Sequence, residues 1–204
     1  MKRAFLVIAL LLATALPAAA QNGTTFGVRV GINFANLSID PEDEEFETKT
    51  KTGLVAGGFA TIPINARFAF QPEVLFSMQG ASVEEFGEEG SIKLDYLNVP
   101  LLASIRLTTG ENPVSFLVGP QIGFRTSGKA VFAGVEEDLE DVLESTDWAL
   151  VFGVAANIRN FVIDARYNHG LSNINKVEVQ GLDDDDEGSV KNRVFAISFG
   201  VTFR

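Results

Sequence analysis

The sequence contains no cysteine and only one histidine among its 204 residues. Without cysteine the chain forms no disulfide and offers no thiol for the lipid anchor of a lipoprotein. Basic residues are also few, with 16 lysines and arginines against 27 acidic residues and a formal net charge of −11. This excess of negative charge argues against a nucleic-acid partner.

Long apolar runs are missing everywhere except near the start of the chain. The N-terminus has a basic start, a short apolar centre and three alanines that end at Ala20. This layout is typical of a secretory signal, and its apolar part is shorter than the ~20 residues of a membrane-spanning helix. We expect cleavage between Ala20 and Gln21, with residues 1–20 as the signal peptide and 21–204 as one domain. No later segment is long enough for a membrane helix, so the chain would enter a membrane only as strands.

The rest of the chain alternates between apolar and polar residues. In "FGVRVGINF", Phe26–Phe34, every second residue is apolar, which predicts a strand with one apolar face and one small or polar face. A short helical turn is expected around Glu136 to Glu144. The same alternation predicts eight strands in all: Thr25–Asn36, Gly53–Ile62, Ala66–Met78, Ile92–Leu107, Val114–Arg125, Trp148–Ile158, Phe161–His169 and Arg193–Phe203.

The connections between these strands alternate between short and long. Those after the second, fourth and sixth strands have few residues, whereas those after the odd strands are long and acidic. Of the 27 acidic residues, all but four fall in the long connections, the four being Glu73, Asp95, Glu111 and Asp164. Short turns at one end and long loops at the other are typical of outer-membrane barrels. The sequence therefore predicts an all-β, eight-stranded, antiparallel up-and-down transmembrane β-barrel in the cell outer membrane; a soluble ligand-binding barrel is the alternative.

The two faces of the strands indicate which side meets lipid. Turned inward, the apolar faces would bring most of the 17 phenylalanines into a lumen that holds a single filling of side chains. We therefore expect the apolar faces outside and a filled polar interior. That interior is expected to hold a polar network of Arg29, Glu73, Gln121, Asp164 and Arg166. The network is either a selectivity constriction or a structural set of ion pairs, and the narrow lumen favours the structural interpretation.

Three prolines fall inside expected strands. Pro72, Pro100 and Pro120 each remove a hydrogen-bond donor from a sheet that has no free edge. Each lies at a similar distance from a short turn, on neighbouring strands. We therefore expect a row of prolines at one height, with local bulges or with inward-turned carbonyls bound by interior polar groups.

Six stretches, "GVRVGINFANL", "FQPEVLFSMQGA", "LDYLNVPLLASIRL", "VGPQIGF", "STDWALVFGVAANI" and "ARYNHGLSNI", carry a resemblance that covers nearly the whole mature chain. They resemble the small outer-membrane β-barrel proteins of Bacteroidetes and related bacteria, often described as porin-family or PorT-like. The resemblance implies an eight-stranded barrel in the outer membrane but no defined activity. A tyrosine is commoner in that family where His169 stands. Phe203, near the C-terminus, looks like the signal read by the barrel-assembly machinery.

Two further motifs suggest chemistry. His169 and Ser172 are loosely similar to the histidine and serine of lipid A deacylases, but no acidic partner is evident and a nucleophilic serine needs an oriented base. The run Asp183–Glu187 could bind a divalent cation, yet it lacks the spacing of a dedicated calcium loop. Such a run is more often a solvated charged loop. We therefore expect no catalytic, cofactor or metal site.

The function expected from these observations is structural or interactive, with acidic outer loops displayed on a membrane-embedded stem. A narrow porin-like channel for small solutes is the alternative, and a lipid-modifying enzyme or a component of a secretion apparatus are less favoured. The expected partners are outer-membrane lipid, the barrel-assembly machinery during insertion, and an unidentified extracellular or periplasmic protein. The barrel itself is expected to be a monomer.

Overall fold

The computed structural model of the chain describes residues 23–40, 48–85, 88–132, 135–139, 142–174 and 189–203. The expected signal peptide, the Ala20–Gln21 cleavage position and the acidic run Asp183–Glu187 lie outside these residues. In the described part of the chain, we find no helix with the length and apolarity needed to cross a membrane.

Strands account for almost all of the described chain. In order, they are β1 (Thr25–Asp40), β2 (Thr48–Pro63), β3 (Phe68–Glu85), β4 (Glu88–Arg106), β5 (Val114–Phe132), β6 (Val135–Asp138), β7 (Thr146–Ile158), β8 (Phe161–Gly170) and β9 (Ser189–Phe203). Eight of them pair in the order β4-β3-β2-β1-β9-β8-β7-β5, and a β4–β5 pairing closes the ring. Every pairing is antiparallel, so the predicted eight-stranded barrel is confirmed.

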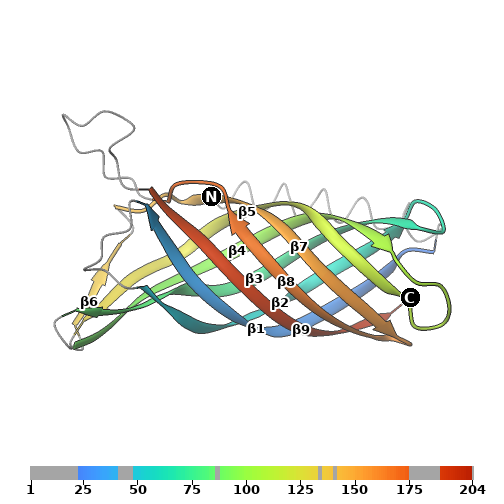
Figure 1. Cartoon of the computed structure of the whole chain (residues 1–204), viewed down its shortest axis with the longest axis horizontal. Coiled ribbons are helices and arrows are strands. Elements are labelled where there is room, and N and C mark those ends of the chain that lie inside the picture. The colour runs from blue at the N-terminus through green and yellow to red at the C-terminus, as the bar shows by residue number, and fades with distance from the viewer. Residues whose placement is uncertain are drawn as a thin grey trace.

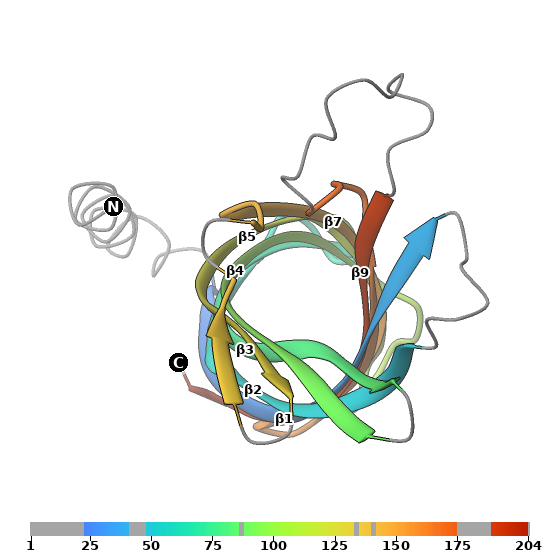
Figure 2. The same cartoon turned by 90° about the vertical axis from the view of Figure 1, so that its left-hand side faces the viewer.

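The strands tilt across the long axis of the barrel, with β6 at one end and the C-terminus of β9 at the other (Figure 1). Viewed from the β6 end, the eight paired strands form a closed ring (Figure 2). The first and last strands join directly, from Phe26↔Phe203 to Asp40↔Ser189. The short turns gather at the end where β9 finishes, which is the periplasmic end in outer-membrane barrels.

The direction of the two strand faces follows the predicted alternation. Val30 on β1 is 56% exposed, whereas its neighbour Arg29 is 5% exposed. The same holds around the barrel, since Phe152 and Ile197 point outward while Glu73 is buried. An apolar band this continuous is unfavourable in water and suited to hydrocarbon. The prediction that the apolar faces point outward is therefore confirmed.

The strands reach further at the outer end than the alternation predicted. β1 continues to Asp40, β3 to Glu85 and β5 to Phe132, so much of what was expected to be loop is paired strand. The expected helical turn is wrong for Val135–Asp138, which is β6 and pairs with the end of β5. The cause is local pairing, because Val131 and Phe132 on β5 favour a strand and β6 extends their sheet.

An exposed ion pair links the two strands of this outer hairpin. Lys129 Nζ lies 2.8 Å from Glu136 Oε2, and both side chains are about half exposed. The hydrogen bond from Lys129 lowers the pKa of the Glu136 carboxyl below its usual value. Pairs this accessible to water contribute little to stability.

The three prolines form the predicted row on β3, β4 and β5. Pro72 lies opposite Leu101, directly beside Pro100, and Pro100 lies opposite Gln121, directly beside Pro120. The β3–β4 and β4–β5 pairings are each interrupted for two residues beside a proline. The register is the same before and after each interruption, so the bulges expected at the prolines are wrong. Close backbone approach accompanies the row: a Cβ on Gly119 would meet the carbonyl oxygen of Leu101.

Candidate functional site: the interior of the barrel

Four charged side chains meet inside the barrel. Arg29 projects from β1, Glu73 from β3, and Asp164 and Arg166 from β8. Each occupies an inward position because side chains alternate between the two faces of a strand. β3 and β8 lie four steps apart in a ring of eight, so they form opposite walls of the barrel. The cluster therefore joins segments that are far apart in both sequence and sheet.

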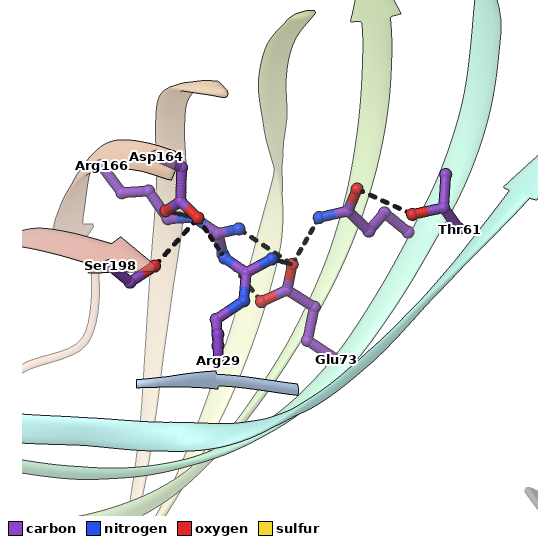
Figure 3. A network of polar contacts seen from close by, with 7 residues as sticks. Arg29, Thr61, Glu73, Asp164, Arg166 and Ser198 are labelled. Carbon is purple, nitrogen blue, oxygen red and sulfur yellow. Dashed lines mark hydrogen bonds and ion pairs between the residues drawn. The ribbon is translucent and has the colours of Figure 1, made fainter. Parts of the chain in front are cut away.

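The four charges form a closed set of ion pairs (Figure 3). Arg166 donates from Nη1 to Glu73 Oε2 at 2.7 Å and from Nε to Asp164 Oδ1 at 2.7 Å. Arg29 donates from Nη1 to Asp164 Oδ2 at 2.8 Å, and its Nη2 lies 3.3 Å from Glu73 Oε1. Each carboxylate thus contacts both guanidinium groups, and the two positive charges balance the two negative ones.

Neutral groups complete the surroundings of the carboxylates. Gln71 Nε2 donates to Glu73 Oε1 at 2.7 Å, and Ser198 Oγ donates to Asp164 Oδ2 at 2.9 Å. The Arg29 guanidinium carbon lies 4.3 Å from the centroid of the Phe59 ring, a cation–π contact. The ring occupies space left by Gly27, where a Cβ would collide with it.

Burial decides between the two interpretations of this network. The side chains of its four charged residues are at most 6% exposed. A selectivity constriction needs charges that face water, whereas charges excluded from water must be paired. The arrangement therefore favours the structural interpretation, with ion pairs that join opposite walls.

Gln121 lies inside the barrel as expected but stands apart from the four charges. It is buried and lines a small cavity of about 20 Å³ beside Arg29 and Arg166. Within the described residues, no hydrogen bond connects Gln121 to the charged groups, and Gln71 has that role instead. The signal for Gln71 is its position two residues before Glu73 on the same strand face.

The interior is less polar than the sequence predicted. Next to the ion pairs, six apolar side chains form a buried layer: Phe59, Leu102, Leu117, Val151, Ala155 and Val162. Leu102 and Leu117 are fully buried. The inward direction of both leucines could be predicted from the alternation, because they stand between residues that were correctly predicted to face outward.

A second apolar cluster closes the outer end of the lumen. It comprises Leu37, Ala81, Leu94, Tyr96 and Ile174, with Ile92, Leu143 and Val190 packed against it. Beside it, Asn192 Nδ2 donates to Asp147 Oδ2 at 2.8 Å and lies 3.2 Å from Tyr96 Oη. Ile174 follows β8 and is 1% exposed, so chain beyond that strand turns back over the barrel mouth.

The opposite end of the interior is open. A cavity of about 660 Å³, here called the vestibule, is surrounded by the short turns and extends inward to Phe59 and Val162. Gln71 lines it as well, so the ion pairs begin directly beyond its inner end. From the periplasmic end, the interior thus consists of the vestibule, then the ion pairs with the apolar layer beside them, and finally the apolar cap.

The whole arrangement can be compared with known families. A family model described as an outer membrane protein beta-barrel domain matches residues 19–176, which is more than half of the chain. The chain belongs to this family. It is accordingly an outer-membrane protein, and the lipid-facing apolar band is the part of this outer-membrane barrel that lies in the bilayer.

Solved structures show the same fold. Neisserial surface protein A (NspA) has 16% sequence identity and a TM-score of 0.50, over 89% of this chain and 99% of that one. The outer membrane protein OprG from Pseudomonas aeruginosa has 11% identity and a TM-score of 0.51, over 90% of this chain and 97% of that one. Identities this low indicate a shared barrel and nothing about activity. No curated protein sequence matches this outer-membrane barrel.

The two residues that suggested an enzyme are not brought together for catalysis. His169 lies on β8, with its ring 6.2 Å from that of Tyr167. Ser172 Oγ accepts a hydrogen bond from the backbone N–H of Trp148 at 2.9 Å, which fixes the chain after β8. Among the described residues, no hydrogen bond joins His169 to Ser172, and no group of three or more possible ligands is placed to hold a metal ion.

Proposed function

We propose that this protein is a non-catalytic, non-conducting stem that holds an acidic outer end at the cell surface for interaction with another molecule. One observation carries the proposal: two apolar clusters and a neutral network of ion pairs fill the lumen beyond the vestibule. A narrow pore for small solutes is the alternative. Unitary conductance steps of the purified barrel in a planar bilayer would favour it.

The outer end supplies the surface for interaction. The strands extend beyond the apolar band, and β6 exposes Glu136 and Glu137 next to the end of β5. In the sequence, most of the acidic residues fall in the long connections predicted for this end. A partner with a basic surface would complement this charge.

The resemblance of the sequence motifs supports a narrower family assignment than the outer-membrane barrel. We infer that the barrel is related to the PorT-like proteins, on the six motifs that resemble them. Membership of a secretion apparatus would follow only if a partner at the outer or periplasmic end belongs to one. Catalysis is disfavoured because, among the described residues, no hydrogen bond joins Ser172 to a base such as His169.

Cross-linking in cells of the native host tests the interaction. We expect a photo-reactive residue in place of Glu137, exposed on β6, to form adducts with a protein. The matched site is Val154, which faces lipid and should form none. Neutralising Glu136, which lies beside the probe, with glutamine should lower the adduct yield several-fold. Equal yields at positions 137 and 154 would contradict a partner at the outer end.

A further inference from the structure

Three arginines line the vestibule at the periplasmic end. Arg67 belongs to the turn between β2 and β3, Arg106 ends β4, and Arg159 belongs to the turn between β7 and β8. All three are exposed to solvent. In a protein with only 16 basic residues and a net charge of −11, three arginines around one cavity run against the overall charge.

The turns that carry these arginines are held by specific hydrogen bonds. Asn65 Oδ1 accepts from the backbone N–H groups of Arg67 and Phe68 at 2.8 and 2.9 Å. Arg106 Nη1 donates to the carbonyl of Ala66 at 3.2 Å, so Arg106 is anchored to the same turn. Arg67 and Arg106 are therefore positioned together before any ligand binds.

Arg159 occupies a backbone conformation that does not suit arginine. Its φ is 56°, and it is the only non-glycine residue with positive φ in the described chain. The turn joins paired residues Ile158 and Phe161, and glycine is the usual residue at positive φ in such two-residue turns. The adjacent Asn160 is fixed, since its carbonyl accepts from the Thr202 N–H at 2.7 Å. The strained backbone at Arg159 points to a role for its side chain at the vestibule.

Among the described residues, arginines outnumber carboxylates around the vestibule. Glu111 is the only carboxylate among its described lining residues. Within the described residues, none of the three arginines forms an ion pair. Arginine binds carboxylate and phosphate oxygens in forked pairs, and a phosphate offers three oxygens and up to two negative charges.

We propose that the vestibule binds a phosphate group, with Arg67, Arg106 and Arg159 as its ligands. A single forked arginine is enough for a carboxylate, whereas three arginines suit the charge and the oxygens of a phosphate monoester. The cavity of about 660 Å³ lies in the range of small-molecule sites, so it accommodates the rest of a small phosphorylated molecule. Two sources have this chemistry: a soluble periplasmic phosphate ester, or the headgroup of a phospholipid in the inner leaflet.

Calorimetric titration of the folded barrel in a phosphate-free, uncharged detergent tests the proposal. The probes are glycerol 3-phosphate and, as the carboxylate control, succinate. We expect glycerol 3-phosphate to bind and succinate to bind more weakly. Substituting Arg67→Gln or Arg106→Gln should weaken glycerol 3-phosphate binding by about tenfold each, the usual effect of losing one charge-assisted contact. The matched control is Arg193→Gln, which removes an exposed arginine on β9 remote from the vestibule.

Arg159→Gly separates binding from folding. Glycine relieves the positive φ, so this variant should unfold at an equal or higher urea concentration while binding the phosphate about tenfold more weakly. Loss of binding in a barrel that is no less stable cannot be attributed to misfolding. Unchanged binding in Arg67→Gln, Arg106→Gln and Arg159→Gly would overturn the proposal, as would equal binding of succinate.

A second arm identifies the source of the phosphate. The same titrations are followed by adding a short-chain phosphatidic acid to the micelles. If the lipid competes with glycerol 3-phosphate, or binds where glycerol 3-phosphate does not, and Arg159→Gly weakens its binding, the site is a headgroup site. If only the soluble ester binds, the ligand is a soluble phosphate. Absence of binding by both probes would reject a phosphate site, and would leave the proposed interaction at the outer end unaffected.

Discussion

Replacing Arg166 by methionine should lower the free energy of unfolding of the barrel by about 3–5 kcal/mol, the usual cost of removing one partner from a buried ion pair. The reason is charge balance. Arg166 contacts both Glu73 and Asp164, and its loss leaves two buried carboxylates with only Arg29 between them. Urea unfolding of the barrel in lipid vesicles measures the change.

A double variant tests whether the charges act as one unit. Adding Glu73→Gln to Arg166→Met leaves the neutral Arg29–Asp164 pair, so the double variant should be more stable than Arg166→Met alone. Gln121→Met is the matched control, because Gln121 is buried in the same lumen outside the network. If the loss of unfolding free energy in the double variant equals the sum of the losses in Arg166→Met alone and Glu73→Gln alone, the charges do not form a coupled network.

An arginine in place of Val30 should destabilise the barrel by about 2–4 kcal/mol, the range for a charge on the lipid face at the bilayer midplane. Val30 lies midway between Phe26 and Phe34 on β1 and is 56% exposed to the surroundings of the barrel. In a soluble barrel the same outward position would accept arginine at little cost. Unfolding in vesicles, compared with the unmodified barrel, gives the difference.

The control for this variant is a position on the same face at the edge of the membrane. Thr52 on β2 is paired with Phe34 and is exposed. Thr52→Arg should cost only about 0–1 kcal/mol, because a long basic side chain near the interface reaches the headgroups. If Val30→Arg and Thr52→Arg have equal effects, Val30 does not lie in hydrocarbon.

The sequence predicted the barrel because its strongest signal is a simple period of two. The alternation on β1 placed Arg29 inside and Val30 outside, and the structure agrees. The strand ends were harder, because polar residues beyond the membrane carry no alternation. There, pairing with a neighbouring strand decides the structure, as it does for β6 with β5.

The contents of the lumen could be predicted only in part. Inward parity identifies Glu73 and Arg166 on their own strands, but their contact depends on how the strands are staggered around the ring. For the same reason, sequence reasoning chose Gln121 where Gln71 is the neighbour of Glu73. The contact of Phe59 with Arg29 was not predicted, because the ring fits there only where Gly27 on the adjacent strand has no side chain.

The vestibule gave no signal in the sequence. Its arginines lie at the ends of separate strands, and the sequence of a short turn contains no pattern that indicates a binding site. Only closure of the barrel brings Arg67 and Arg159 to one cavity. The backbone of Arg159 is likewise not evident from the residue type, because arginine is unusual at positive φ.

The lumen is closed beyond the vestibule, and thiol accessibility tests this closure directly because the chain has no cysteine of its own. Thr61 lines the vestibule and is partly exposed, whereas Ser77 is buried and lines the small cavity on the other side of the ion pairs. Each is replaced singly by cysteine and the folded barrel is treated with a water-soluble, negatively charged methanethiosulfonate. Thr61→Cys should react readily and Ser77→Cys at least about a hundredfold more slowly, since a thiol in a packed interior reacts only after local opening. Equal rates at the two positions would show a continuous water path through the ion pairs and contradict the closed lumen.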